Sequence, residues 1–378
     1  MWLLVPGRRV AFAALVGTVS SASPPRFRVR RVNGNEEEED DYSAVAIASP
    51  RRAGSGMFKL DYGTFYASKT FSFQSDGDGH VRRERRVIWA WSDETDVCRP
   101  WPACERVWPR PPKDVRRRWR GLQTSPRDIL WDAQAGVVLT RPVPELARLR
   151  LPRYQNRPAT AEIKLQPDAR RAEEGVAGLA AQVAEFAATF DVSSIVSAGA
   201  QACEYRFGIR LYHTDGSDSI QGRDYTDVVY QLAVRSTSPV LGLWVLRNHT
   251  GGATSDHGDN QPQGGPVIIS SAAVDATSNS EWRQLSLTLF TDLSIIEAFA
   301  QGGQEAVTSR IYPLTKLLKA TDALAPWSAA LIAETKPLHP GGCGAPVART
   351  GASVLLSGAV EAYELGSCWV DTPDLLPV

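Results

Sequence analysis

Short runs in which apolar and polar residues alternate fill most of this 378-residue chain, and Gly, Pro, Asn, Asp and Ser separate them. Alternation with a period of two is typical of β-strands with one buried face, and the spacing that marks a helix is scarce. Eight such strands in the C-terminal half predict a β-sandwich of jelly-roll size. The predicted strands cover 207–215, 227–234, 241–248, 266–271, 283–292, 294–300, 306–313 and 358–365.

Three segments nearer the N-terminus show the same alternation and predict a smaller antiparallel sheet. Residues 58–73 and 85–94 predict strands, and residues 128–142 predict a hairpin. The Pro- and Arg-rich stretch 97–120 predicts an insertion. Its run of three arginines is typical of a solvated basic patch, because no aromatic stacking residues accompany it. The chain is therefore predicted to be all-β.

Two segments do not fit a simple strand pattern. Residues 143–151 predict a short helical connection between the small sheet and the sandwich. Residues 180–192 (AAQVAEFAATFDV) are compatible with either a helix or a strand by propensity.

One charged residue interrupts an otherwise apolar hairpin. The stretch Leu293–Pro313 (LSIIEAFAQGGQEAVTSRIYP) predicts two strands that meet at Gln301-Gly302-Gly303, where the glycines supply the positive φ of a tight turn. Glu297 lies in the middle of the first strand. A carboxylate in such a place needs hydrogen-bond partners, since burying it unpaired is costly.

Composition excludes some classes of function. Apolar residues make up 43% and charged residues 22%, as in ordinary folded chains, and the formal net charge is zero. A balanced charge does not favour nucleic acid or an anionic membrane as a partner. The sequence holds no run of 18 apolar residues, so no membrane-spanning helix is expected.

The first 56 residues differ in character from the rest. Arg8 and Arg9 precede the apolar run Val10–Val19 and the small residues Ser20 to Ala22, which resembles a secretory signal. A disordered start and an organelle transit peptide are the alternatives. Six consecutive acids follow at 36–41, a block typical of a solvated tail. The predicted division of the chain is 1–56 signal-like or disordered, 57–150 the small sheet with its insertion, and 151–378 the sandwich.

The cysteines favour neither a metal site nor a clear disulfide framework. Five are present, at positions 98, 104, 203, 343 and 368, and none forms a C-x-x-C pair, so we expect no metal site and no cofactor. The sequon Asn248-His249-Thr250 predicts glycosylation of Asn248 if the chain is secreted.

Three stretches of the sequence resemble parts of one protein family. LSLTLFTDLSIIEAFAQGGQEAVTSRIYP (285–313) resembles the C-terminal β-sandwich of glycoside hydrolase family 32, the plant-type acid invertases, fructan hydrolases and fructosyltransferases. LDYGTFYASKTF (60–71) with RRVIWAWSDETD (85–96) is similar to the last blade of its five-bladed propeller. GLQTSPRDILWDAQAGVVLTRPVPELARLR (121–150) resembles the segment that closes the propeller and leads into the sandwich. The resemblance implies a remnant of the propeller followed by a sandwich, with Glu297 in a structural role near the contact between them.

The catalytic motifs of that family are not found in this chain. In that family, Asn-Asp-Pro holds the Asp nucleophile, Arg-Asp-Pro holds a stabilising Asp, and Glu-Cys holds the acid/base Glu. The carboxyl groups of the nucleophile and the acid/base must lie about 5–5.5 Å apart. Arg127-Asp128 is followed by Ile129, and Cys104-Glu105 and Cys203-Glu204 have the reversed order. We therefore assign no catalytic residue and expect a truncated, inactive relative.

Four residues match the part of the last blade that approaches the active-site funnel in relatives: Asp61, Tyr62, Tyr66 and Trp91. Aromatic faces suit sugar rings and a carboxylate suits their hydroxyls, so these residues are candidate sugar contacts, and packing of the blade is the alternative. Leu246 replaces a Cys of plant relatives, so their disulfide with Cys203 cannot form in the usual way.

Three hypotheses remain for the function. The chain is a truncated β-fructofuranosidase-like hydrolase, a non-catalytic sugar-binding or regulatory β-sandwich protein, or a product without function. Its expected partners are sucrose or fructan-type sugars, bound weakly, and either a second copy or an intact family member, because a single blade leaves one apolar face uncovered. The apolar residues expected on that face are Phe65, Phe71, Ile88, Trp89 and Trp91. The signal-like start points to a secreted, cell-wall or vacuolar location.

Overall fold

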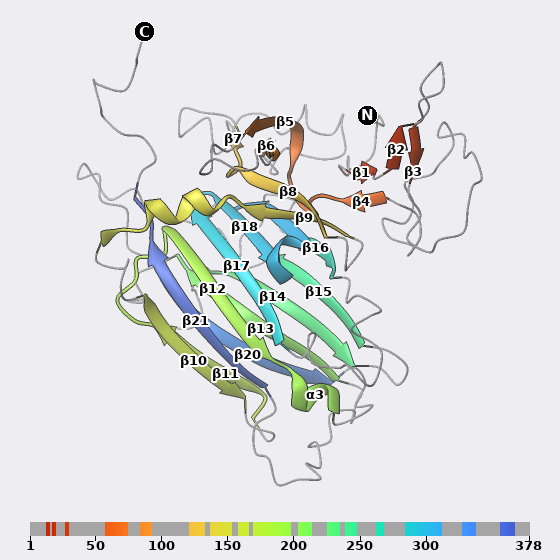
Figure 1. The fold of residues 1–378 in the computed structure, drawn as a ribbon. Coiled ribbons are helices and arrows are strands. Elements are labelled where there is room, and N and C mark those ends of the chain that lie inside the picture. Colours follow the sequence, from red (N-terminus) through yellow and green to blue (C-terminus); the bar gives the residue numbers. More distant parts are fainter. Residues whose placement is uncertain are drawn as a thin grey trace, which may run out of the picture.

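The computed structural model describes sixteen segments of the chain, most of them strands. They are residues 13–15, 17–19, 27–29, 57–74, 84–92, 121–132, 137–152, 158–165, 169–197, 203–213, 225–234, 239–247, 262–267, 284–311, 327–337 and 356–366. Within them the chain is all-β, as predicted, and forms a two-layered sandwich with a small sheet at one end (Figure 1).

The sandwich consists of two antiparallel six-stranded sheets that pack face to face. The first has the order β10-β21-β12-β17-β18-β19 and the second β11-β20-β13-β14-β15-β16. One continuous core fills the space between them, and Phe186, Phe190, Phe207 and Tyr230 are fully buried in it. The strands of the first sheet are β10 (Ala159–Leu165), β21 (Leu356–Glu364), β12 (Val183–Asp191), β17 (Gln284–Asp292), β18 (Ile295–Ala300) and β19 (Glu305–Arg310). Those of the second are β11 (Arg171–Val176), β20 (Ser328–Pro337), β13 (Cys203–Tyr212), β14 (Tyr225–Val234), β15 (Pro239–Leu246) and β16 (Gln263–Pro266).

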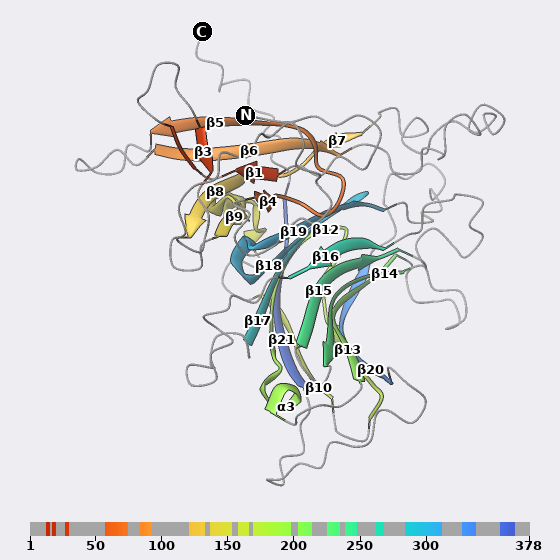
Figure 2. The same cartoon turned by 90° about the vertical axis from the view of Figure 1, so that its right-hand side faces the viewer.

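The small sheet, called the blade below, is also antiparallel. Its order is β5-β6-β8-β9, and β7 adds to the end of β6. The strands β5 and β6 lie farthest from the sandwich, and β8 and β9 lie nearest (Figure 2). The bounds are β5 (Tyr66–Gln74), β6 (Glu84–Ser92), β7 (Leu122–Gln123), β8 (Arg127–Asp132) and β9 (Val137–Pro142).

The connection between blade and sandwich is a 3₁₀ helix, η2 (Pro144–Leu149), in the place predicted for a short helical segment. Arg150 at its end forms a bidentate ion pair with Glu185 of β12, at 2.7 and 2.8 Å. The guanidinium also lies 3.8 Å from the ring centroid of Tyr363. These contacts fix the chain where it enters the sandwich.

Seven of the eight predicted strands are confirmed with small shifts of their ends. In the region of the eighth, predicted at 266–271, the described strand is β16, which ends at Pro266, and residues 268–271 lie outside the described residues. Gly264 permits the close pairing of β16 with β15, because a Cβ there would lie 2.1 Å from the Leu243 carbonyl oxygen. The ambiguous residues 180–192 form strand β12 rather than a helix.

The predicted turn of the hairpin is confirmed. Gly302 and Gly303 have φ values of 64° and 96°, and Gln301 also has a positive φ of 49°. A Cβ on Gly303 would meet the carbonyl oxygen of Thr140 in β9 at 2.6 Å. The turn therefore needs glycine both for its conformation and for close contact with the blade.

Three short strands belong to the first 56 residues. β1 (Ala13–Leu15) pairs with β4 (Met57–Lys59) at the entry to the blade, and β2 (Gly17–Val19) pairs with β3 (Phe27–Val29). Several predictions fall outside the described residues: the acidic run, the Arg-rich insertion, Asn248 and four of the five cysteines. Cys203 is buried and disulfide-bonded, and since it is the single described cysteine its partner also lies outside the described residues.

Candidate functional site at the contact between blade and sandwich

Arg127 of β8 is the centre of a buried polar cluster that joins the two sheets. Its side chain is completely buried. Nη1 donates to Asp61 Oδ2 at 2.8 Å, and Nη2 donates to Glu297 Oε2 and Thr308 Oγ1, both at 2.6 Å. Asp61 belongs to the chain that enters the blade, whereas Glu297 and Thr308 belong to the hairpin of the sandwich.

Asp61 has no acceptor site left for a ligand. Besides Arg127, its Oδ2 accepts from Thr308 Oγ1 at 2.7 Å. Oδ1 accepts from the backbone nitrogens of Gly63 and Thr308, at 2.7 and 2.9 Å. A carboxylate offers about four lone-pair sites, and here all of them are used inside the protein.

Glu297 finds its hydrogen-bond partners on the blade. Its two oxygens accept from Ser125 N at 2.7 Å and from Arg127 Nη2 at 2.6 Å. The side chain lies at the contact between blade and sandwich and is 4% exposed. The prediction that hydrogen bonds hold it near this contact is confirmed.

Two aromatic rings close the cluster from solvent. The guanidinium carbon of Arg127 lies 4.5 Å from the ring centroid of Phe65 and 4.7 Å from that of Phe299. Burial alone would lower the pKa of Arg127, but the carboxylates of Glu297 and Asp61 outweigh it and raise the pKa above its ordinary value. Arg127 is therefore a permanent cation that balances two buried acids.

The backbone reinforces the same contact. Residues 61–64 run alongside β19, with Tyr62 N donating to the Ala306 carbonyl and Thr64 N to the Thr308 carbonyl, both at 2.8 Å. A Cβ on Gly63 would lie 1.8 Å from the Thr308 carbonyl oxygen. This segment thus covers the edge strand of the first sheet, which would otherwise expose unpaired backbone groups.

The structure separates the four candidate sugar contacts into two groups. Asp61 lies in the buried cluster. The ring of Tyr62 packs on Gly265 of β16, and Lys59 Nζ lies 4.0 Å from the centroid of that ring. Tyr66 and Trp91 lie at the surface, 39% and 37% exposed, with their ring centroids 6.1 Å apart. A sugar contact therefore stays a prediction for Tyr66 and Trp91, whereas Asp61 and Tyr62 already pack against other protein atoms.

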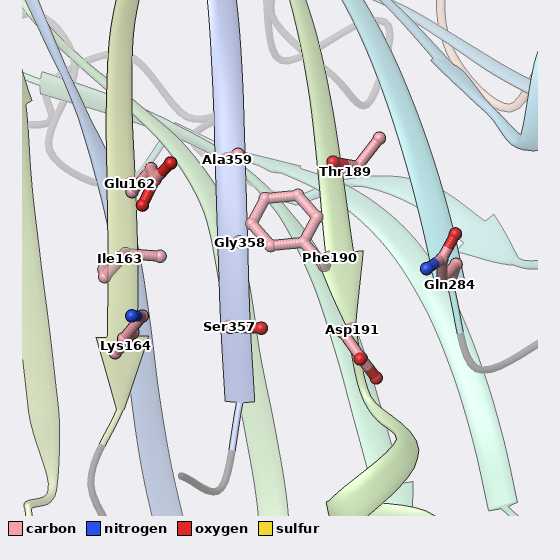
Figure 3. A pocket seen from close by; sticks show the side chains of 10 residues that line it. All are labelled: Glu162, Ile163, Lys164, Thr189, Phe190, Asp191, Gln284, Ser357, Gly358 and Ala359. Atoms are coloured by element: carbon pink, nitrogen blue, oxygen red, sulfur yellow. The ribbon is translucent and has the colours of Figure 1, made fainter.

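A polar depression lies on the outward face of the first sheet. Its volume is about 250 Å³. The residues around it come from β10, β21, β12 and β17, and Glu162, Lys164, Thr189 and Asp191 contribute most of its polar groups (Figure 3). These side chains are exposed and no aromatic ring at the surface accompanies them, so the depression is a solvated sheet face without the features of an enclosed ligand site.

The hydrophobic and polar pattern of the sequence did not indicate that Arg127 is the centre of this cluster or that Thr308 belongs to it. One signal was present: a lone carboxylate, Asp61 in the blade and Glu297 in the sandwich, stands in an otherwise apolar segment on each side of the contact. Buried acids are paired, so a cation had to lie between them. In the part of the chain that the structure describes, no group of three His, Cys, Asp or Glu residues could hold a metal ion, and no helix is both long and apolar enough to cross a bilayer.

Two family descriptions match consecutive parts of the sequence. "Glycosyl hydrolases family 32 N-terminal domain" matches residues 26–142, and "Glycosyl hydrolases family 32 C terminal" matches residues 145–329. The chain belongs to glycoside hydrolase family 32. The boundary between the two matches falls at the start of η2, where the blade gives way to the sandwich.

Several plant enzymes are similar to this chain. The chain is 28% identical over 258 residues to acid β-fructofuranosidase AIV-18 of Capsicum annuum, covering 68% of this chain and 36% of that one. It is 29% identical over 269 residues to the vacuolar acid β-fructofuranosidase 2 of a Rosa hybrid cultivar, again 68% of this chain and 36% of that one. The crystal structure of fructan 1-exohydrolase IIa from Cichorium intybus matches with a TM-score of 0.53 and 20% identity, covering 94% of this chain and 55% of that chain. This chain therefore spans little more than a third of the length of these two curated relatives.

Proposed function

We propose that this chain is a non-hydrolytic member of glycoside hydrolase family 32. Retaining hydrolysis needs one carboxylate that attacks the anomeric carbon and a second that protonates the leaving oxygen. The three sequence motifs that supply these groups in the family are not found in the 378 residues. The chain then keeps the sandwich and one blade of the family without its chemistry.

One observation supports the proposal most directly. Asp61 and Glu297 are the carboxylates that the fold brings together next to the predicted sugar contacts, and both bind the same guanidinium. Asp61 has no lone pair free for attack on a sugar. Both oxygens of Glu297 are likewise engaged inside the protein, by Ser125 N and by Arg127 Nη2.

The proposed sugar contacts are Tyr66 and Trp91. Their exposed rings suit the apolar face of sucrose or a fructan. Because the rings lie on an open surface that cannot desolvate a ligand, we expect millimolar or weaker affinity. The same proposal includes a secreted or vacuolar location, and the name of the Rosa relative includes the word vacuolar. It also includes association with a second copy or with an intact family member.

The experiment is a paired assay of hydrolysis and binding on the purified chain. Fructose release from sucrose and inulin is measured for the wild type and for Asp61→Asn and Asp128→Asn, and calorimetric titration measures affinity for the same sugars. We expect no fructose release from any of the three and weak binding that a Trp91→Ala variant loses. Turnover that survives purification and falls in either Asp variant would contradict the proposal.

A further inference from the structure

One face of the blade presents a row of four aromatic rings. Strand alternation points Trp89 and Trp91 of β6 away from Ile88 and Ala90, which are buried on the opposite face. Tyr66 and Phe71 of β5 flank them, with centroid distances of 6.1 Å for Tyr66–Trp91 and 5.5 Å for Phe71–Trp89. Each ring is between 36% and 44% exposed. These four residues are called the aromatic patch.

The uncovered apolar set differs from the one that the sequence predicted. Phe71, Trp89 and Trp91 are exposed as expected, but Phe65 and Ile88 are 3% and 0% exposed. Phe65 covers the guanidinium of Arg127, and Ile88 packs in the small core of the blade. The exposure is therefore confined to one face of the two strands that lie farthest from the sandwich (Figure 2).

We infer that the aromatic patch is the contact surface for a second copy of this chain, in a two-fold symmetric dimer. The inference rests on the self-association included in the proposed function and specifies its surface. In a two-fold contact the same patch meets itself, which places Trp89 and Trp91 at the centre, where the residues that dominate binding are normally found.

The shape and charge of the patch suit a second copy of the same surface. The paired rings are inclined by 60° and 48°, so they form an uneven surface into which the rings of a second copy can interdigitate. Lys69 pairs with Trp89 across β5 and β6, so a charged residue lies beside the rings. An ammonium over the ring of a second copy is a favourable contact, so the patch complements itself. The zero net charge of the chain adds no repulsion between copies.

The area of the patch sets the expected strength. With roughly 200 Å² per aromatic side chain, the four exposed fractions amount to about 300 Å² per copy. A stable interface buries about 1,200–2,000 Å² in total. The rings therefore supply the core of an interface whose rim must come from the surrounding polar groups, and we expect a reversible dimer rather than an obligate one.

The test is sedimentation velocity of the full chain over a wide range of concentration. We expect a monomer–dimer equilibrium that weakens at least about tenfold in Trp89→Ser/Trp91→Ser. Trp131→Ser is the matched control, because Trp131 is 37% exposed and alternation places it on the opposite face of the blade, so its dimer should match the wild type. Circular dichroism verifies that each variant is folded. Lys69→Glu gives a second probe that does not alter the rings and should also weaken the dimer.

Three results would overturn the inference. They are a monomer at every concentration, an association that the double variant leaves unchanged, and equal weakening by Trp131→Ser. A monomer whose tryptophan fluorescence changes with inulin would instead assign the patch to sugar. Because fructose release is measured separately on the same samples, failure of the dimer and failure of the non-hydrolytic proposal are distinguishable.

Discussion

At the scale of single residues, the cluster around Arg127 decides what the carboxylates of this chain can do. Replacing a buried ion network with apolar groups is often tolerated, but removing one partner leaves uncompensated charge and costs about 3–5 kcal/mol. One cation, Arg127, balances two acids in this cluster, so we expect the stability of the fold to depend most on that cation.

Arg127→Met should therefore lower the free energy of unfolding by about 3–5 kcal/mol in urea titrations followed by tryptophan fluorescence. Arg171→Met is the control, because its ion pair with Glu173 is half exposed and should contribute less than about 1 kcal/mol. Neutralising both acids in Arg127→Met/Asp61→Asn/Glu297→Gln should restore part of the loss. Equal losses in Arg127→Met and Arg171→Met would show that the cluster is not a buried charge network.

His213 gives a pH-dependent prediction at the same scale. Burial lowers its pKa from 6.5 to about 3, and Nε2 lies 2.9 Å from Thr226 Oγ1. The unfolded chain takes up a proton near pH 6.5, whereas the folded chain does not until about pH 3. The unfolded state thus binds more protons in this window, and stability falls as the pH drops, by up to about 1.4 kcal/mol per unit.

His213→Gln removes the titrating group and keeps a hydrogen-bonding side chain of similar reach to Thr226. The loss of unfolding free energy between pH 7 and pH 5 should be about 1–2 kcal/mol smaller in this variant than in the wild type. Denaturant titrations at the two pH values measure the difference. The same pH dependence in both proteins would refute the assignment.

At the scale of elements, the segment 61–64 joins blade and sandwich because it covers β19. Gly63 permits this approach, since any side chain there would collide with the Thr308 carbonyl. Gly63→Ala should cost about 1–3 kcal/mol through overpacking, measured by thermal and urea unfolding. Gly175→Ala in β11, where an added Cβ would meet nothing within 4 Å, should stay within about 0.5 kcal/mol. A harmless Gly63→Ala would mean that the segment is free to move away from β19.

How much of the fold could be predicted depended on how each strand is buried. Strand β17 alternates buried residues with exposed or half-buried ones over its first six positions, so its pattern was visible in the sequence. Strand β20 was missed because Ala330 to Ala333 are buried on both faces, which removes the alternation. Strand β11 was missed because only Val176 of its six residues is buried. The Gly-Gly pair of β16 lay outside the predicted strand, which began at 266, although close packing against β15 is what requires glycine there.

The site was less predictable than the fold. Asp61 and Glu297 lie 66 and 170 residues from Arg127 along the chain, and only the tertiary arrangement brings the three together. Resemblance to relatives pointed to Asp61 as a sugar contact, but a resemblance at one position does not reveal the partners that occupy it. The sequence pattern did indicate that Glu297 needed hydrogen bonds, because burial of a charge has a physical cost wherever it occurs.

At the scale of the whole molecule, the described residues combine a two-layered sandwich with a blade, and the contact between them engages Asp61 and Glu297. The balanced charge and the exposed aromatic patch are the features on which the proposed dimer rests. The central claim is that no carboxylate of this chain acts as a nucleophile toward a fructosyl group.

Intact-protein mass spectrometry after rapid denaturing quench tests that claim most directly. The purified chain is mixed with excess sucrose, quenched with acid and compared with a catalytically competent family member treated in the same way. A retaining mechanism passes through a covalent glycosyl-enzyme ester on the nucleophile, so the competent enzyme can show a mass increase of one fructosyl group. We predict that this chain shows its unmodified mass at every time of quenching. A fructosyl adduct on the chain, mapped by peptide sequencing to Asp61, Glu297 or any other carboxylate, would contradict the account.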